Sequence, residues 1–349
     1  MEAVFSFLLL FSALILLGWF LFFLAAGIIV YHSSMSTTPA AFETRSILEA
    51  EKKTVVYSHT KDPRLMDIVN EGRARWETYR EEGLFDELSL VTHDGLSLSG
   101  YYWPAGRNPG LNRSSGPNRF SSYPERTVVL LHALMDSASG MNYLAEAYHQ
   151  LGWNVFSPDM RSHGESEGKY RTLGIRESGD LACWVRLLVE RYALKIIFIH
   201  GVSMGAATGL FYGAGKKNLH EAVKGIISDS SYSDYREALI KVVESMVKYR
   251  FLARSIVFGA NITSICHTGV RFGRMSPEKI THTIPVPILL FHGQKDVLIP
   301  VGMARKLFSR AVKPSDEMVV VPEAPHVGAF FYARDFYMQK IMDFVRRST

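Results

Sequence analysis

Ser203 lies in the segment GVSMG (201–205), which matches the pattern G-x-S-x-G. The apolar run KIIFIH precedes it and a helical stretch follows, so the pattern stands between a predicted strand and a predicted helix. Such a tight turn strains the backbone of its central residue, and glycines make room where side chains would clash. The serine hydroxyl would then project at the end of the strand, as a catalytic nucleophile must.

A serine hydroxyl needs a histidine base, and the histidine needs a carboxylate to hold its tautomer. Asp296 follows the predicted strand PILLFHG, and His326 follows the predicted strand MVVV. The chain order Ser, Asp, His is the order found in this type of strand-turn-helix enzyme, and parallel strands gather their carboxyl ends at one edge. The sequence therefore predicts Ser203 as nucleophile, His326 as base and Asp296 as the orienting acid.

Other acidic and basic residues also follow strands. Asp229, after the run IIS, is the rival acid, although a structural role in a turn is favoured there. His132, His200 and His292 end predicted strands, and we interpret them as buried histidines with satisfied hydrogen bonds.

Acyl transfer also needs hydrogen-bond donors for the oxyanion that develops on the substrate. One donor should be the backbone N–H of Met204, the residue after the nucleophile. The other should come from the loop after the strand TVVLLH, and we choose Leu134.

Composition excludes several other classes of protein. The formal net charge is +5, from 39 Lys and Arg against 34 Asp and Glu, so no nucleic-acid partner is expected. Two cysteines are too few for a disulfide scaffold or a cysteine-rich metal site. No metal-binding or phosphate-binding motif is present, so we expect neither a metal nor a cofactor.

Strands and helices alternate through most of the chain. This alternation predicts a mostly parallel sheet between helical layers over residues 85–347, entered by a β-hairpin that turns at His93-Asp94-Gly95. Residues 233–283 interrupt the alternation with Met-bearing and aromatic helical stretches. We interpret them as a small lid inserted between two late strands, with ordinary packing helices as the alternative.

The N-terminal segment Val4–Val30 is apolar and uncharged, and it is longer than the roughly 20 residues that span a bilayer. It lacks the basic start and short apolar region of a cleaved signal peptide, so it predicts a single-pass transmembrane anchor. Residues 31–84 are expected to hold a juxtamembrane linker and a helix. The charges that flank the segment set its orientation poorly, and we lean to an extracytoplasmic catalytic domain.

Over residues 85–347 the chain resembles the α/β-hydrolase superfamily. The resemblance is carried in order by VVLLHALMDS, SPDMRSHGESEG, IHGVSMGA and ILLFHGQKDVLIP followed by VPEAPH. It is nearest to membrane-anchored bacterial serine hydrolases of the serine-aminopeptidase-like branch and more distant from the Bem46-like group. The resemblance implies the same nucleophile, acid and base, and it adds no further residue.

Two positions depart from the family pattern. The family usually has His-Gly where this chain has His132-Ala133, and a Cβ there could crowd the loop that supplies the second oxyanion donor. Ser162 in Arg-Ser-His-Gly replaces the usual glycine, in a loop that we expect to support the site.

These observations predict a membrane-anchored serine hydrolase that cleaves carboxylic esters through an acyl-enzyme. Small-molecule esters and acyl lipids are the expected substrates, and membrane lipid is the expected partner of the N-terminal helix. The alternatives are an amide or peptide hydrolase, an acyltransferase on the same fold, and a catalytically weak binding module. The sequence does not define the oligomeric state.

Overall fold

A single mixed sheet forms the frame of the molecule. The computed structural model describes residues 2–37, 63–109 and 125–349, and within them the strands pair in the order β1-β2-β4-β3-β5-β6-β7-β8. β2 runs antiparallel to β1 and β4, and the other neighbours are parallel, which confirms the mostly parallel sheet. The strands are β1 (Asp86–Val91), β2 (Ser97–Trp103), β3 (Arg126–Leu131), β4 (Asn154–Pro158), β5 (Ile196–Val202), β6 (Val223–Asp229), β7 (Ile288–Gly293) and β8 (Glu317–Val321).

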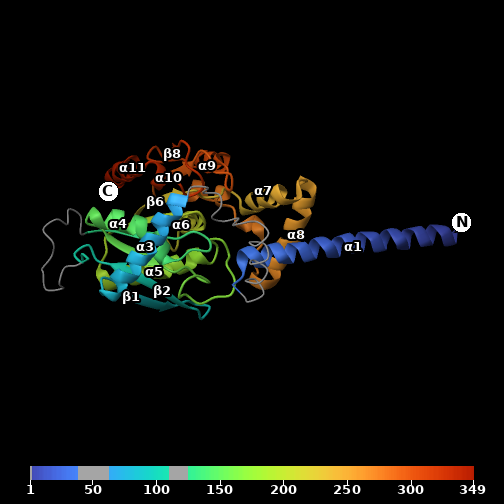
Figure 1. Cartoon of the computed structure of the whole chain (residues 1–349), viewed down its shortest axis with the longest axis horizontal. Helices are drawn as coiled ribbons and strands as arrows, with labels where there is room; N and C mark the ends of the chain where they lie inside the picture. The colour runs from blue at the N-terminus through green and yellow to red at the C-terminus, as the bar shows by residue number, and fades with distance from the viewer. Residues whose placement is uncertain (1, 38–62, 110–124) are drawn as a thin grey trace.

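Helices cover both faces of this sheet, so the fold has three layers (Figure 1). In β3, Val129 and Leu131 join one apolar cluster while Val128 and Leu130 join the other. Alternate side chains of a strand point to opposite faces, which is why the run VVLL is apolar throughout. One face carries α5 (Glu177–Tyr192), α6 (Met204–Ala214) and α9 (Val301–Phe308), and the other carries α3 (Pro63–Glu81), the short η1 (Ala138–Met141), α4 (Asn142–Gln150) and α11 (Arg334–Ser348).

The hairpin predicted at the start of the domain is confirmed. Leu88 pairs with Gly100 in antiparallel register, and the turn between the strands passes through Gly95 at φ +82°. Glycine adopts this left-handed conformation without steric cost. The hairpin extends the sheet at the edge next to β4.

A helical insertion separates β6 from β7. α7 (Tyr235–Val247) begins at Asp234, whose side chain accepts the backbone N–H three residues further on at 3.1 Å. α8 (Arg250–Thr268) ends at Gly269, which has the left-handed φ of +70° that a helix C-terminus favours. Three short 3₁₀ helices follow: η2 (Phe272–Arg274), η3 (Pro277–Lys279) and η4 (Thr281–Thr283). These elements occupy the segment 233–283 for which the sequence predicts a lid.

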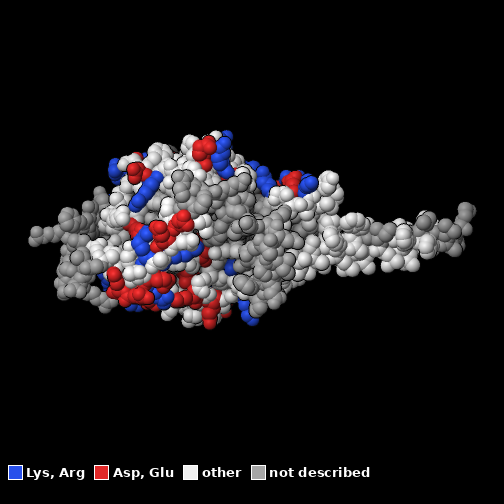
Figure 2. Space-filling view, viewed as in Figure 1, with Lys and Arg blue, Asp and Glu red and all other residues white. Residues whose placement is uncertain are grey.

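The N-terminal helix α1 (Glu2–Met35) projects from the body, and the described side chains along its projecting part are uncharged in Figure 2. Among the described residues it is the helix that by length and composition could cross a membrane, and its position fits a membrane span or a signal sequence. The helix continues past Val30, because Tyr31 and Met35 are fully buried in the body. Residues 31–35, predicted to begin the linker, are therefore helical, and its stretch 38–62 lies outside the described residues.

The helical segment that ends the chain is divided in two. α10 (Ala329–Tyr332) ends at Ala333, whose ψ of 48° turns the chain before α11 begins. This turn lets the ring of Phe330 pack edge-on against Tyr337, with centroids 5.7 Å apart. The aromatic packing explains a break that helical periodicity does not predict.

Candidate active site

Ser203 occupies the turn between β5 and α6 with a strained backbone. Its φ is 53° and its ψ is −109°, a conformation that side-chain-bearing residues rarely adopt. A Cβ on Gly201 would lie 2.2 Å from the backbone of Gly205, and a Cβ on Gly205 would lie 2.1 Å from the carbonyl oxygen of Leu131. The two glycines of the motif are thus required by the close approach of α6 to the strand ends.

The structure brings the three predicted triad residues together. His326 Nε2 lies 3.0 Å from Ser203 Oγ, and His326 Nδ1 lies 2.7 Å from Asp296 Oδ2. His326 follows β8 and Asp296 follows β7, so all three side chains sit at the carboxyl edge of the sheet. His326 and Asp296 are both buried, which strengthens the interaction between imidazole and carboxylate.

Asp296 is held by further contacts. Its Oδ1 accepts the backbone N–H groups of Leu298 at 3.0 Å and Ile299 at 2.7 Å. His292 Nε2 lies 3.3 Å from Oδ2 and donates to the Ile299 carbonyl oxygen at 2.6 Å. Burial opposes the charge of Asp296, but His326 and His292 outweigh it and lower the pKa of this carboxyl to about 2. Burial likewise lowers the pKa of His292, but Asp296 raises it above its ordinary value.

Asp229, the rival acid, faces other partners. Its carboxylate accepts from Ser230 Oγ at 2.8 Å and from Tyr337 Oη at 2.9 Å. Its carbonyl oxygen accepts the backbone N–H of Ser203 at 2.8 Å, and burial raises the pKa of its carboxyl. Of the two candidate acids, Asp296 makes the contact with His326.

A buried chain of hydrogen bonds runs from Asp229 into the core. Burial lowers the pKa of His200 to about 3, so its ring is neutral. Its Nδ1 lies 3.0 Å from Tyr148 Oη and its Nε2 lies 2.9 Å from Tyr337 Oη. Since Tyr337 donates to Asp229, His200 Nε2–H donates to Tyr337 and Nδ1 accepts from Tyr148.

His132 also has two hydrogen bonds, to the Ala133 carbonyl oxygen at 2.7 Å and from the Met160 N–H at 3.0 Å. The interpretation of His132 and His200 as satisfied buried histidines is confirmed. His292 differs, because it also touches the carboxylate of Asp296.

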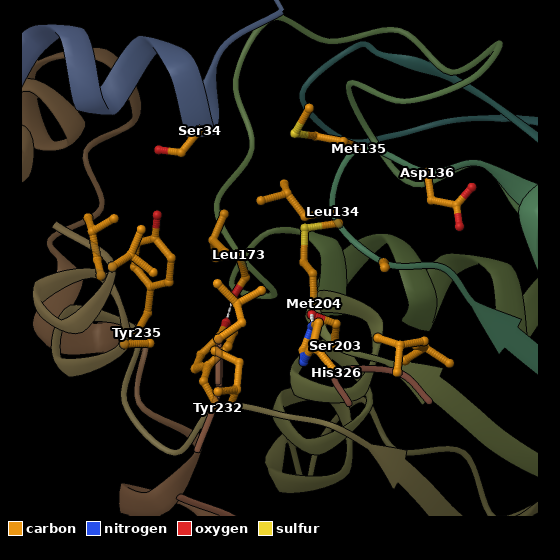
Figure 3. Close-up of a pocket in the computed structure, with 18 of the residues that line it drawn as sticks. Ser34, Leu134, Met135, Asp136, Leu173, Ser203, Met204, Tyr232, Tyr235 and His326 are labelled. Carbon is orange, nitrogen blue, oxygen red and sulfur yellow. Dashed lines mark hydrogen bonds between the residues drawn. The ribbon is translucent and has the colours of Figure 1, made fainter. Parts of the chain in front are cut away.

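The two predicted oxyanion donors border the same cavity as Ser203 (Figure 3). Met204 is the first residue of α6, where a backbone N–H has no partner within the helix. Leu134 lies in the loop after β3, and among the described residues no hydrogen bond from its N–H is found. Both N–H groups are therefore available to a ligand.

The loop that contains Leu134 accommodates the unusual alanine without strain. Among its residues the positive φ belongs to Met135, at 63°, and not to Ala133, so the methyl group of Ala133 costs no backbone energy. The Met135 N–H donates to His163 Nε2 at 3.3 Å, and burial lowers the pKa of His163 so that its ring stays neutral.

The second departure from the family pattern does fall on a strained residue. Ser162 has a φ of 64°, which explains why the family usually has glycine there. The neighbouring Arg161 is buried and forms ion pairs with Asp180 at 2.6 Å and Asp94 at 2.9 Å. These ion pairs tie the loop to α5 and to the hairpin turn.

The cavity beside Ser203 has a volume of about 470 Å³ and mostly apolar walls. This volume falls within the usual range of ligand pockets, roughly 300–1,000 Å³. The insertion contributes Leu239, Val243 and Ile256, and the body contributes Leu173 and Tyr232. Ala26, Ile29, Val30, Ser33 and Ser34 of α1 complete the wall.

Sequence reasoning missed the contacts of His292 and of α1. The spacing of four residues between His292 and Asp296 is a signal for the first, since both flank the same strand end. For α1 the signal is the pair of serines that ends the apolar run. These serines lie in the part of α1 that borders the cavity, beyond its exposed apolar part.

Comparison with known proteins agrees with this geometry. Residues 122–268 match the sequence model of the family described as serine aminopeptidase, S33. The uncharacterised protein YqkD of Bacillus subtilis is 27% identical over 221 residues, which cover 63% of this chain and 70% of YqkD. The monoacylglycerol lipase of Mycolicibacterium smegmatis is 25% identical over 232 residues, or 58% of this chain and 81% of that enzyme.

A solved structure has the same fold. The esterase Pf2001 of Pyrococcus furiosus aligns with a TM-score of 0.60 and 24% identity, over 77% of this chain and 95% of the esterase. Together with the sheet order and the match to the family model, this likeness establishes the fold. The chain has the α/β-hydrolase fold, and its residues 122–268 resemble the S33 serine aminopeptidases.

Proposed function

We propose that this protein is a membrane-anchored serine hydrolase that cleaves carboxylic acyl esters. The observation that carries the proposal is the unbroken contact from the Ser203 hydroxyl through His326 to Asp296. Nucleophile, base and orienting acid within hydrogen-bond distance form the recurring arrangement for acyl transfer.

The proposed reaction has two halves. Ser203 Oγ attacks the ester carbonyl carbon while His326 Nε2 takes its proton, and the N–H groups of Met204 and Leu134 bind the oxyanion. The bond to the alcohol oxygen then breaks, the proton passes from His326 to that oxygen, and an acyl-enzyme remains. Water, deprotonated by His326, attacks the acyl carbon, and the carboxylic acid leaves as Ser203 regains its proton.

Asp296 keeps the imidazole in the required tautomer. Because its pKa lies at about 2, it is ionised at neutral pH and accepts the Nδ1–H of His326. The lone pair of Nε2 then faces Ser203, and the carboxylate stabilises the imidazolium formed during attack.

The cavity supports an acyl ester as the substrate. Its apolar walls suit a hydrocarbon chain better than a peptide, whose amide groups would lose hydrogen bonds to water there. The similar proteins named monoacylglycerol lipase and esterase act on substrates of this kind.

The proposed anchor is the projecting part of α1. From Phe5 to Phe22 its described side chains are apolar or small and most are exposed, a surface that lipid would cover. At about 1.5 Å per residue this stretch spans about 27 Å, close to the thickness of a hydrocarbon core, roughly 30 Å.

Labelling with a fluorophosphonate probe tests the nucleophile. The full-length protein in detergent should be labelled, and the variant Ser203→Ala should lose the label because the reacting oxygen is gone. Ser34→Ala is the matched control, since Ser34 lines the same cavity and its hydroxyl bonds to the Val30 carbonyl oxygen at 2.8 Å. Equal labelling of wild type and Ser203→Ala would show that another residue is the nucleophile.

A further inference from the structure

One face of α1 forms the outer wall of the cavity. The lining residues Ala26, Ile29, Val30, Ser33 and Ser34 follow the spacing i, i+3, i+4, i+7, i+8, so they share one side of the helix. The hydroxyls of both serines bond to the carbonyl oxygen of Val30, at 3.0 and 2.8 Å. The wall is thus mainly apolar despite the two serines.

A side of α1 adjacent to this lining face packs tightly against α8. A Cβ on Gly27 would lie 2.4 Å from the backbone of Ala260, and a Cβ on Gly259 would lie 2.5 Å from the carbonyl oxygen of Phe23. The two backbones therefore touch, as they do where small residues meet at helix crossings. Around Gly18, on the projecting part of the same helix, a Cβ would meet nothing within 4 Å.

The ring of Tyr31 adds to this packing, because it stacks on His267 of α8 with ring centroids 5.4 Å apart. The close fit involves Phe23, Gly27 and Tyr31, at the end of α1 that borders the cavity. Figure 3 shows Ser34 on the α1 side of the cavity, with Ser203, Met204 and His326 on the other side.

We propose that the lining face of α1, formed by Ala26, Ile29, Val30, Ser33 and Ser34, is a specificity element that contacts the acyl chain of the substrate and limits its length. The proposal rests on the proposed function, since it needs an acyl ester bound at Ser203. An acyl chain with its carbonyl at Ser203 would fill the cavity that Leu239 and Val243 of α7 and Val30 of α1 line. The helix that carries the anchor is then also part of the binding site.

The test compares two tryptophan variants of the full-length protein in detergent. Val30→Trp fills the cavity from its α1 wall, whereas Ile28→Trp is the control because Ile28 is 40% exposed and lies outside the lining. The ratio of kcat/KM for p-nitrophenyl laurate to that for p-nitrophenyl butyrate should fall by about ten-fold or more in Val30→Trp, since lost apolar contacts discriminate on that scale. In Ile28→Trp the ratio should stay within about two-fold, as for surface substitutions.

A second pair of variants tests the same wall through the contact between α1 and α8. Gly27→Leu pushes α1 away from α8 and should also lower the ratio of laurate to butyrate turnover, while Gly18→Leu should not. Fluorophosphonate labelling and thermal melting of each variant show whether the body is folded. An unchanged ratio in both Val30→Trp and Gly27→Leu, with labelling intact, would overturn the proposal.

Binding of a long-chain fluorescent fatty acid separates this proposal from the function on which it rests. If the wild type neither cleaves an ester nor takes up the fluorophosphonate, the proposed function fails. Weaker fatty-acid binding in Val30→Trp than in Ile28→Trp still supports α1 as the wall of a chain-binding cavity. Equal binding in these two variants overturns it.

Discussion

Asp296 carries its negative charge where water barely reaches it. Two backbone N–H groups and two imidazoles surround its carboxylate, and together they hold its pKa at about 2, below the ordinary 3.8. A group whose pKa is lowered by folding stabilises the folded state above its unfolded pKa, and this contribution disappears as the pH falls through the folded value. Asp296 therefore links the stability of the fold to the orientation of His326.

We expect Asp296→Asn to lower both activity and stability. An amide cannot accept the Nδ1–H of His326 through its nitrogen, so kcat for p-nitrophenyl butyrate should fall by about 10²–10⁴. At neutral pH the free energy of unfolding should fall by about 2 kcal/mol, the size that the pKa shift implies. The urea midpoints of wild type and variant should converge as the pH falls from about 4 to about 2. A constant difference across this pH range would contradict the assignment of the stabilising charge to Asp296.

The contact of Ser203, His326 and Asp296 could be expected from the sequence, because each residue follows a recognisable strand in the order that this fold uses. The hydrogen-bond partners that surround these residues could not be predicted from the sequence. His292 reaches Asp296 because the carbonyl oxygen of Ile299 directs its ring, and the path of that loop is not encoded in a local pattern. Likewise, Tyr337 meets Asp229 across 108 positions of chain.

The turn between β5 and α6 shows how one element sets the position of a side chain. The backbones of β3, β5 and α6 come so close that neither Gly201 nor Gly205 has room for a Cβ. The cost of the strained φ at Ser203 is offset by the packing of α6, whose buried residues include Met204, Ala207 and Leu210. The position of Ser203 is fixed by the close packing of the elements around it.

We expect Gly205→Ala to destabilise the protein and Gly209→Ala to be mild. The new methyl group at 205 would lie 2.1 Å from the Leu131 carbonyl oxygen, whereas at 209 it would meet the Cγ2 methyl groups of two isoleucines at 3.3 and 3.4 Å. Overpacking against backbone costs about 1–3 kcal/mol, and a domain of this size loses about 2–4 °C in Tm per kcal/mol. Differential scanning calorimetry of both variants measures the effect. Equal melting temperatures would contradict the close packing of α6 against β3.

At the level of elements, the alternation of strands and helices predicts the sheet. Each short apolar run is long enough for a strand but too short for a helix. The inserted helices are harder to place from sequence. The apolar residues of α8 pack partly on α7 and partly on α1, and the position of Gly259 against Gly27 is a long-range relation that helical periodicity does not contain.

The whole molecule consists of a body that holds the site and a helix that extends away from it (Figure 1). Leu14 and Leu17 are 58% and 51% exposed on this helix. Exposed apolar residues on every side of a helix are stable in lipid but not in water. The proposed anchor and the hydrolase body therefore meet at α8.

Two arginines in the projecting helix should abolish membrane association. Each arginine near the centre of a span costs about 3 kcal/mol on insertion, so the double variant Leu14→Arg, Leu17→Arg should leave the membrane fraction after a carbonate wash. Val91→Arg is the control, because Val91 is 73% exposed on the body and should not change the fractionation. Retention of the double variant, or a wild type that is soluble, would contradict the anchor.

The sequence predicts the apolar span of α1, but it does not predict that the end of this helix lines the cavity beside Ser203. An apolar stretch is equally stable in lipid and against a protein cavity, because both remove it from water. Composition therefore does not reveal that Ala26–Ser34 borders the site. Only the three-dimensional position of α8 distinguishes the two environments.

The crossing at Gly27 and Gly259 has a consequence for any shortened form of this enzyme. Proteolysis after Thr37 would liberate a soluble body, but it would also strip α8 of its neighbour and leave the cavity without one side. The released fragment would be a catalyst with a different substrate range, and its selectivity would not report on that of the intact chain.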